Sequence, residues 1–224
     1  MPDSRAQVQV WDWTLRLFHW LTVFGFALMW WTAEQGIMDW HRRLGVTLVG
    51  LLVYRLVWGL IGPATARFAR MLVRPRELLA HVRDMLGRRH HPHFGHNPAG
   101  ALSVIAMLLA LATQVSTGLF AVDVDGLESG PLGRYVSFET GRLFAEIHHI
   151  SFKVLLTLIG LHLVAIATYL LLFKDNLVRP MLTGHRPRAD FGTSPADSRA
   201  RWPRIIGAAV IALAVVSAIL YAGG

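Results

Sequence analysis

The stretch IHHISFKVLLTLIGLHLVAIATYLLLF, residues 147–173, is a long apolar segment that carries a histidine near its start and another near its middle. At about 100° per residue, the fourteen-residue spacing of His148 and His162 puts both within about 40° on one helix face. At about 1.5 Å per residue they are about 21 Å apart along the axis, in a hydrocarbon core about 30 Å thick. Ionisable residues inside a membrane span point to function. The segment therefore predicts a transmembrane helix with one site near each membrane surface.

The composition is that of an integral membrane protein. Hydrophobic residues make up 54% of the 224 residues and charged residues only 16%, whereas soluble domains carry about 25% charged residues. Long continuous apolar runs exclude a membrane barrel, whose strands need alternating polarity. We predict an all-α integral membrane fold with five transmembrane helices, of which the fifth, C-terminal one is expected to serve packing or partner contact. The predicted spans are 14–33, 44–62, 99–122, 147–173 and 205–222.

The charges are distributed unevenly between the segments that connect these spans. Residues 63–98 and 174–204 are rich in arginine. Residues 123–146, hereafter the outer segment, are net acidic. The positive-inside rule places the basic segments in the cytoplasm. We therefore predict a multi-pass membrane protein with a cytoplasmic N-terminus and a C-terminus on the opposite, outer side, and no nucleic-acid partner. The first span has no basic region before it and no cleavage site after it, so we expect it to remain in the mature protein.

Four histidines in or beside the predicted spans sort by depth. His19 lies near the cytoplasmic end of the first span, and His41 lies just before the second span on the opposite side. With the histidines of the fourth span they form two depth-matched pairs: His19 with His162 on the cytoplasmic side, and His41 with His148 on the outer side. His149 lies about 140° around the helix from His162, so we predict that it is not a ligand.

Two imidazoles on one flat, largely apolar cofactor indicate a six-coordinate b-type haem. Zinc is disfavoured because nothing supplies a third and fourth protein ligand at either depth. The absence of cysteine excludes a disulfide, a thiolate-bound cluster and a covalently attached c-type haem. Haem propionates need cationic partners, and Arg16 and Arg55 are the candidates. Either arginine could instead extend towards the membrane interface.

The remaining histidines need no cofactor. His90, His91, His93 and His96 form the dense cluster HHPHFGH. Such a cluster could bind a transition metal, but a solvated basic loop is the favoured interpretation.

Other features of the basic segments are explained without a site. His81 and His185 are isolated in cytoplasmic segments and are also expected to be solvated. Residues 78–86 show helical spacing of apolar side chains and predict a short amphipathic helix on the membrane surface, ended by Gly87. Residues 190–203 predict a flexible connector.

An ordered set of motifs runs through most of the chain. In sequence order they are VWDWTLRLFHW (10–20), HRRLGVTLVGLLVYRLVWGLIGP (41–63), GHNPAGAL (95–102), STGLFAVDVDG (116–126), GPL (130–132), IHHISFKVLLTLIGLH (147–162) and NLVRPMLTGHRPR (176–188). Together they resemble the bacterial cytochrome b561 family, which includes the b-type cytochrome subunits of nickel–iron hydrogenases. The resemblance covers roughly residues 8–188.

The resemblance implies a four-helix di-haem transmembrane bundle over residues 1–188, followed by a linker and a fifth transmembrane helix at 189–224. It also implies the bacterial inner membrane, so that the outer side and the C-terminus are periplasmic. It implies two bis-histidine haem b groups, and their ligands carry over to His19, His41, His148 and His162. Two departures stand out: His149 occupies a position that is often acidic in the family, and the outer segment reads DVD where adjacent acids are usual.

Three functions remain open at this point. The first is an electron carrier between the quinone pool and a periplasmic c-type cytochrome or hydrogenase-like protein. It includes a hydrogenase-type subunit that anchors a periplasmic enzyme. The acidic outer segment would suit a basic partner of such a carrier. The second is a stand-alone superoxide:quinone oxidoreductase, which the same acidic segment disfavours because it repels superoxide. The third is a transporter or structural subunit without haem. The sequence leaves open the direction of electron flow and whether the protein is itself an enzyme.

Overall fold

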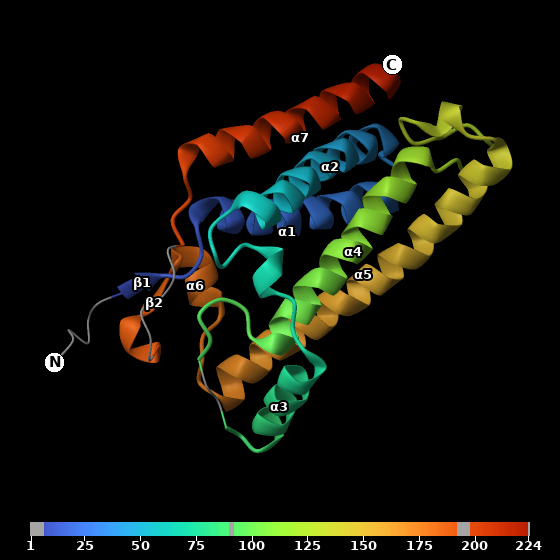
Figure 1. Cartoon of the computed structure of the whole chain (residues 1–224). Helices are drawn as coiled ribbons and strands as arrows, with labels where there is room; N and C mark the ends of the chain where they lie inside the picture. Colours follow the sequence, from blue (N-terminus) through green and yellow to red (C-terminus); the bar gives the residue numbers. More distant parts are fainter. Residues whose placement is uncertain (1–6, 90–91, 192–197, 224) are drawn as a thin grey trace. The chain divides into compact units, whose positions relative to one another are not determined.

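The computed structural model describes residues 7–89, 92–191 and 198–223 (Figure 1). These residues are mainly helical. The α-helices are α1 (Trp13–Glu34), α2 (Met38–Ile61), α3 (Pro75–Leu86), α4 (Pro98–Phe120), α5 (Phe138–Leu172), α6 (Val178–Thr183) and α7 (Trp202–Gly223). The two short strands are β1 (Gln7–Gln9) and β2 (His185–Pro187), and single 3-10 turns occur at Phe68–Arg70, Gly133–Tyr135 and Arg188–Asp190.

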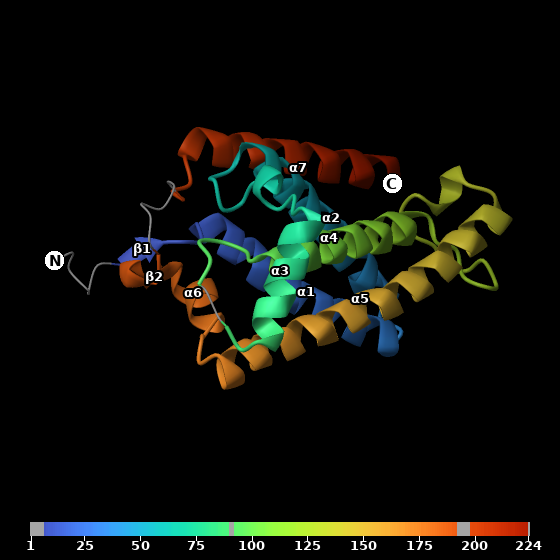
Figure 2. The same ribbon diagram turned by 60° about the horizontal axis from the view of Figure 1, so that its bottom comes forward.

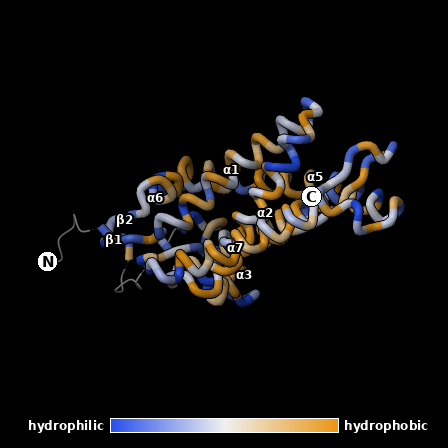
Figure 3. Tube along the Cα trace, turned by 90° about the horizontal axis from the view of Figure 1, so that it is seen from above, coloured by the Kyte–Doolittle hydropathy of each residue, from blue (hydrophilic) through white to orange (hydrophobic). Residues whose placement is uncertain are grey.

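Among the described residues, four helices are long and apolar enough to cross a membrane: α2, α4, α5 and α7. The membrane helical class is therefore confirmed. Figure 3 shows apolar residues running along α2 and α7. The 22-residue helix α1 does not belong to this set, so a five-span arrangement stays a prediction.

The chain forms two compact units. Unit 1 comprises Met1–Leu17, Val57–Ala106 and Leu158–Ile205, and unit 2 comprises Phe18–Leu56, Met107–Thr157 and Ile206–Gly224. Helices α1, α2, α4 and α5 each contribute residues to both units, whereas α3, α6, β1 and β2 belong to unit 1.

A buried aspartate fixes the start of α1 in unit 1. The carboxylate of Asp12 is fully buried, and its Oδ1 accepts hydrogen bonds from the backbone N–H groups of Thr14 and Leu15, both at 3.0 Å. Its Oδ2 accepts a hydrogen bond from the indole N–H of Trp58 at 3.2 Å, and Trp58 is also fully buried. Asp12 therefore caps α1 and joins it to the end of α2.

We expect Asp12→Ala to destabilise the protein clearly. Loss of the cap costs about 0.5–2 kcal/mol, and loss of the hydrogen bond from the buried Trp58 N–H adds about 1–3 kcal/mol. Thermal unfolding of the detergent-solubilised protein measures the effect as a lower midpoint. Asp12→Asn keeps a capping oxygen, so its unfolding midpoint should lie between those of the wild type and Asp12→Ala. An Ala variant with the wild-type midpoint would contradict this role.

The two strands form a small antiparallel pair in unit 1. Gln7 pairs with Pro187 and Gln9 with His185, and Figure 2 shows β1 beside β2 and α6. The pair continues through Gly184, whose carbonyl accepts the backbone N–H of Val10 at 2.8 Å. Gly184 has a φ of 86°, and a Cβ there would lie 2.9 Å from the carbonyl oxygen of Trp11. Only glycine fits both constraints.

Helix α3 confirms the predicted amphipathic helix, which ends before Gly87. Leu79 and Leu86 are exposed on it, as a membrane-surface helix requires, although that placement stays a prediction. His81 is a correction: it is buried rather than solvated, because it lies on the inward face of α3 and pairs with Tyr169 at 3.1 Å. His185 is exposed, as expected.

The HHPHFGH cluster is described only in part, because His90 and His91 lie outside the described residues. His93 packs edge-on against His81 with ring centroids 5.6 Å apart, and His96 contacts Trp11 at 4.6 Å. Within the described ranges no three histidines or acids group to hold a metal ion. Residues 192–197 of the predicted connector are likewise outside the description.

Helix α7 packs against α2 in unit 2. A Cβ on Gly50 would lie 2.8 Å from Val216 Cγ2, so the small residue allows this close approach. The outer segment also contacts the end of α7, because Arg134 and Tyr135 both donate to the carbonyl of Ala222, Tyr135 at 3.0 Å. These contacts give α7 a packing role within this unit.

Candidate functional site

In unit 2 the structure brings His41 on α2 and His148 on α5 together. Their ring centroids are 6.3 Å apart and their planes meet at 79°. A metal–imidazole bond is about 2.0 Å long and a ring centroid lies about 1.1 Å from its own nitrogens, so two imidazoles on opposite sides of one metal ion have centroids about 6 Å apart. The His41–His148 separation therefore fits a bis-histidine site.

The hydrogen bonds of both rings leave the same nitrogen for a ligand bond. His41 Nδ1 lies 3.0 Å from the carbonyl oxygen of Met29 on α1, and His148 Nδ1 lies 2.9 Å from the carbonyl oxygen of Gln114 on α4. A carbonyl can only accept, so each Nδ1 carries the proton and each Nε2 carries a lone pair. Metal-binding histidines characteristically donate their second N–H to a carbonyl in this way.

The His148 ring packs against helix α4. A Cβ on Gly118 would lie 2.8 Å from His148 Cε1, so the ring lies directly against the α4 backbone. The side-chain amide of Gln114 lies 3.0 Å from His148 Nε2, and Ser151 donates to the Gln114 amide oxygen. For His148 Nε2 to bind iron, the Gln114 side chain has to turn aside.

Sequence reasoning missed these supporting residues. Gln114 and Ser151 are polar side chains inside apolar spans, and Ser151 lies one turn after His148. Thr32, whose hydroxyl lies 3.3 Å from His41 Nδ1, is a third. Their polarity in apolar surroundings is the signal that would have found them.

His148 and His149 face different surroundings, although their rings lie only 6.4 Å apart. The His148 side chain faces His41 and α4, whereas His149 is exposed and lines a surface pocket with Glu146 and Lys153. This difference matches the predicted difference in helix face.

The second predicted pair divides between the units. His19 on α1 belongs to unit 2, is half-buried and packs edge-on against Trp20 with centroids 5.0 Å apart. His162 belongs to unit 1 and is also half-buried. Helix α5 is continuous and carries both His148 and His162. The pairing of His19 with His162 stays a prediction.

The profile of a family described as prokaryotic cytochrome b561 matches residues 10–184. The chain belongs to the prokaryotic cytochrome b561 family. No similar curated protein was found. The match includes all four candidate histidines and ends before α7, and it confirms the resemblance drawn from the motifs. The protein is therefore a membrane b-type cytochrome of electron transfer with haem b as its cofactor.

The two arginines predicted as propionate partners lie in different units, and their role stays a prediction. Arg16 in unit 1 donates through one terminal nitrogen to the carbonyl of Leu182, and its buried Nε has no hydrogen-bond partner among the residues described. Arg55 in unit 2 is only 2% exposed.

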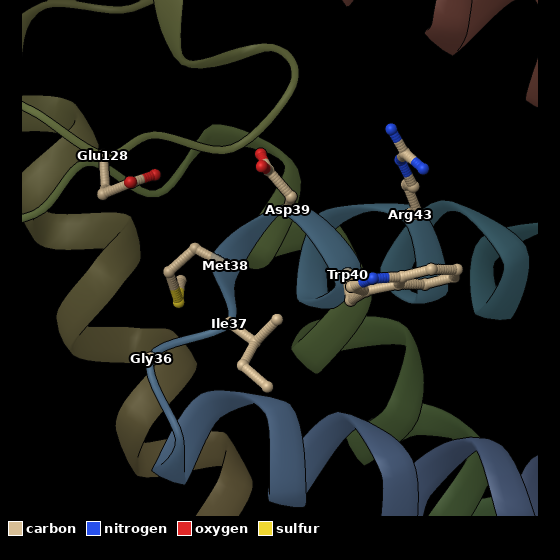
Figure 4. A pocket seen from close by; sticks show the side chains of 7 residues that line it. All are labelled: Gly36, Ile37, Met38, Asp39, Trp40, Arg43 and Glu128. Carbon is tan, nitrogen blue, oxygen red and sulfur yellow. The ribbon is translucent and has the colours of Figure 1, made fainter.

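A pocket at the first turns of α2 lies next to His41 in sequence (Figure 4). Arg42 forms ion pairs with Asp39 on the same helix and with Glu128 of the outer segment. Trp40 is exposed at this pocket and packs against the guanidinium of Arg43, 5.5 Å from the ring centroid. The pocket is lined by Gly36, Ile37, Met38, Asp39, Trp40, Arg43 and Glu128. It combines carboxylates and a guanidinium with an aromatic side chain.

Proposed function

We propose that this cytochrome is a di-haem electron carrier that links a periplasmic redox partner to the quinone pool of the bacterial inner membrane. The observation that carries the proposal is the His41–His148 pair, with centroids 6.3 Å apart and each Nδ1 held by a backbone carbonyl. In the same proposal His19 and His162 hold the second haem. Residues 1–188 form the di-haem domain, and residues 189–224 add the linker and fifth helix.

The residues of the chain position the cofactor rather than react. When bound, haem supplies an iron that changes oxidation state by one electron. His41 and His148 would hold the iron through neutral Nε2 atoms, and the carbonyls of Met29 and Gln114 fix that protonation state and the ring orientation. Arg16 and Arg55 would neutralise propionates, and the apolar spans exclude water.

The orientation follows from the charges. With the arginine-rich segments in the cytoplasm, the His41–His148 pair lies towards the periplasm, and the pocket formed by Asp39, Trp40 and Glu128 also faces that side. We propose a basic periplasmic c-type cytochrome or hydrogenase-like protein as the partner, because complementary charge accelerates encounter. The acidic outer segment argues against a superoxide:quinone oxidoreductase.

A reduced-minus-oxidised spectrum of the purified protein tests this function. We expect b-type α-bands and a haem-to-chain ratio of about two, as bis-histidine ligation at both depths requires. A redox titration should resolve two transitions, and a quinol should reduce the protein. Absence of b-type bands would overturn the proposal, and rapid reduction by superoxide without a partner would favour the oxidoreductase instead.

A further inference from the structure

Helix α3 in unit 1 presents an apolar stripe that the protein does not cover. Leu79, Val82 and Leu86 are 58%, 41% and 81% exposed. At about 100° per residue they fall within a sector of about 60° on the helix surface. His81 lies about 160° round from Leu79, is buried and pairs with Tyr169 of α5 at 3.1 Å. One side of α3 therefore packs on the protein, and a different side exposes three large apolar side chains.

The charged residues of α3 occupy two separate sectors around this stripe. Arg76 and Arg83 lie about 40–60° round from Leu79, directly beside the stripe, and both are exposed. Glu77 and Asp84 lie about 140–160° round from Leu79, nearly opposite the stripe. Positive charge therefore borders the apolar surface, and negative charge is kept away from it.

The neighbours of α3 in unit 1 are the ends of membrane helices. Unit 1 contains the last residues of α2, the first residues of α4 and the C-terminal part of α5. Each of these three helices is long and apolar enough to cross a membrane. Residues 62–74 and 87–97 connect α3 to α2 and α4, and Figure 1 shows α3 beside the C-terminal end of α5. Helix α3 is therefore held where the spans end, at the level of the lipid head groups.

An apolar stripe bordered by guanidinium groups at this level matches the chemistry of an anionic phospholipid. Apolar side chains of an interfacial helix enter the boundary between head groups and acyl chains. A guanidinium group binds a phosphate through two parallel N–H donors. A zwitterionic head group carries the same phosphate, but its ammonium group offsets the attraction, so a lipid with net negative charge binds better. The carboxylates of Glu77 and Asp84, opposite the stripe, stay in water and do not repel the head groups.

We infer that α3 is a binding element for anionic phospholipid. Leu79, Val82 and Leu86 enter the bilayer interface, and Arg76 and Arg83 bind the phosphates of the head groups. The buried side of α3, packed on α5, keeps this surface turned towards the lipid. This role is additional to electron transfer and needs no haem, because it depends on the helix and the bilayer alone.

A fluorescent label tests the depth of the stripe. The chain contains no cysteine, so Leu86→Cys in the full-length protein takes a bimane label at one defined position. Ala80→Cys is the matched control, because Ala80 is also exposed but lies about 120° round the helix from Leu86. In phosphatidylcholine nanodiscs, phosphatidylcholine with a nitroxide near its head group should quench the label at position 86 more strongly. Iodide in the water should quench the label at position 80 more strongly.

The same label at position 86 measures the lipid preference. Unlabelled phosphatidylglycerol should displace the nitroxide phosphatidylcholine about 3–10-fold better than unlabelled phosphatidylcholine does, because two arginines attract its net charge. Arg76→Gln/Arg83→Gln should bring this ratio close to one. Arg179→Gln/Arg188→Gln is the matched control, since it removes two exposed arginines elsewhere in unit 1 and should keep the wild-type ratio.

Three results would overturn the inference. The first is equal lipid quenching at positions 80 and 86. The second is a label at position 86 shielded from both lipid and iodide, as a bound protein would shield it. The third is an unchanged phosphatidylglycerol preference in Arg76→Gln/Arg83→Gln. Haem content should equal that of the wild type in every variant, so none of these results bears on the proposed electron transfer.

Discussion

Replacing His41 with alanine should remove about half of the haem from the purified protein, because one iron loses an axial ligand that no neighbouring side chain replaces. His148→Ala should remove the same half. If the two histidines share one haem, the double variant His41→Ala/His148→Ala loses no more than either single variant. Haem-to-protein ratios from pyridine haemochrome spectra measure all three.

Two comparisons make this expectation specific. His149→Ala is the matched control, since it removes an exposed imidazole next to His148 and should keep full haem content. Combining His41→Ala with His162→Ala should remove both haems. Haem loss in His149→Ala, or further loss in the His41/His148 double variant, would show that the assignment of this pair is wrong.

Gly118→Ala should displace the His148 ring. The added methyl would lie 2.8 Å from His148 Cε1 and 3.1 Å from Nδ1, and the ring is fixed on that side by its hydrogen bond to the Gln114 carbonyl at 2.9 Å. Overpacking of this kind costs about 1–3 kcal/mol, which corresponds to about a 5–150-fold loss of haem affinity at this site. Titration of the purified protein with haemin, after haem extraction, measures the change.

Gly207→Ala in α7 is the matched control for that substitution. Among the described residues, no atom outside the backbone of its own helix and its chain neighbours lies within 4 Å of its added methyl, and alanine is favoured over glycine in a helix by about 1 kcal/mol. The control should therefore bind haem as wild type and unfold at the same or a slightly higher temperature. Equal haem affinity in Gly118→Ala and Gly207→Ala would refute the close approach of His148 to α4.

Hydropathy predicted all the long helices but not all of their ends. The helix that contains the second predicted span begins at Met38 rather than at residue 44. The helix that contains the fourth begins at Phe138 rather than at residue 147. Both extensions are polar, so a search for apolar runs stops where the helix continues beyond the hydrocarbon. Ser137 marks one true start, because its hydroxyl accepts the backbone N–H of Thr140 at 3.2 Å, as capping residues do.

The candidate site was predictable where it depended on helical spacing and unpredictable where it depended on contacts across helices. Depth alone grouped His41 with His148, two residues that lie on different helices and more than a hundred positions apart. The role of Gln114 and the burial of His81 follow from packing between α4 and α5 and between α3 and α5. Sequence periodicity identifies which face a residue occupies, but not which neighbour that face meets.

The pairing of β1 with β2 has a consequence for the order in which the chain folds. Gln9 bonds to a strand that begins at His185, so β1 cannot pair until the helices between the two strands have been synthesised. A contact this distant in sequence forms late. A nascent chain stopped before Gly184 therefore carries an unpaired β1, and the pairing of β1 with β2 reports that synthesis has passed this point.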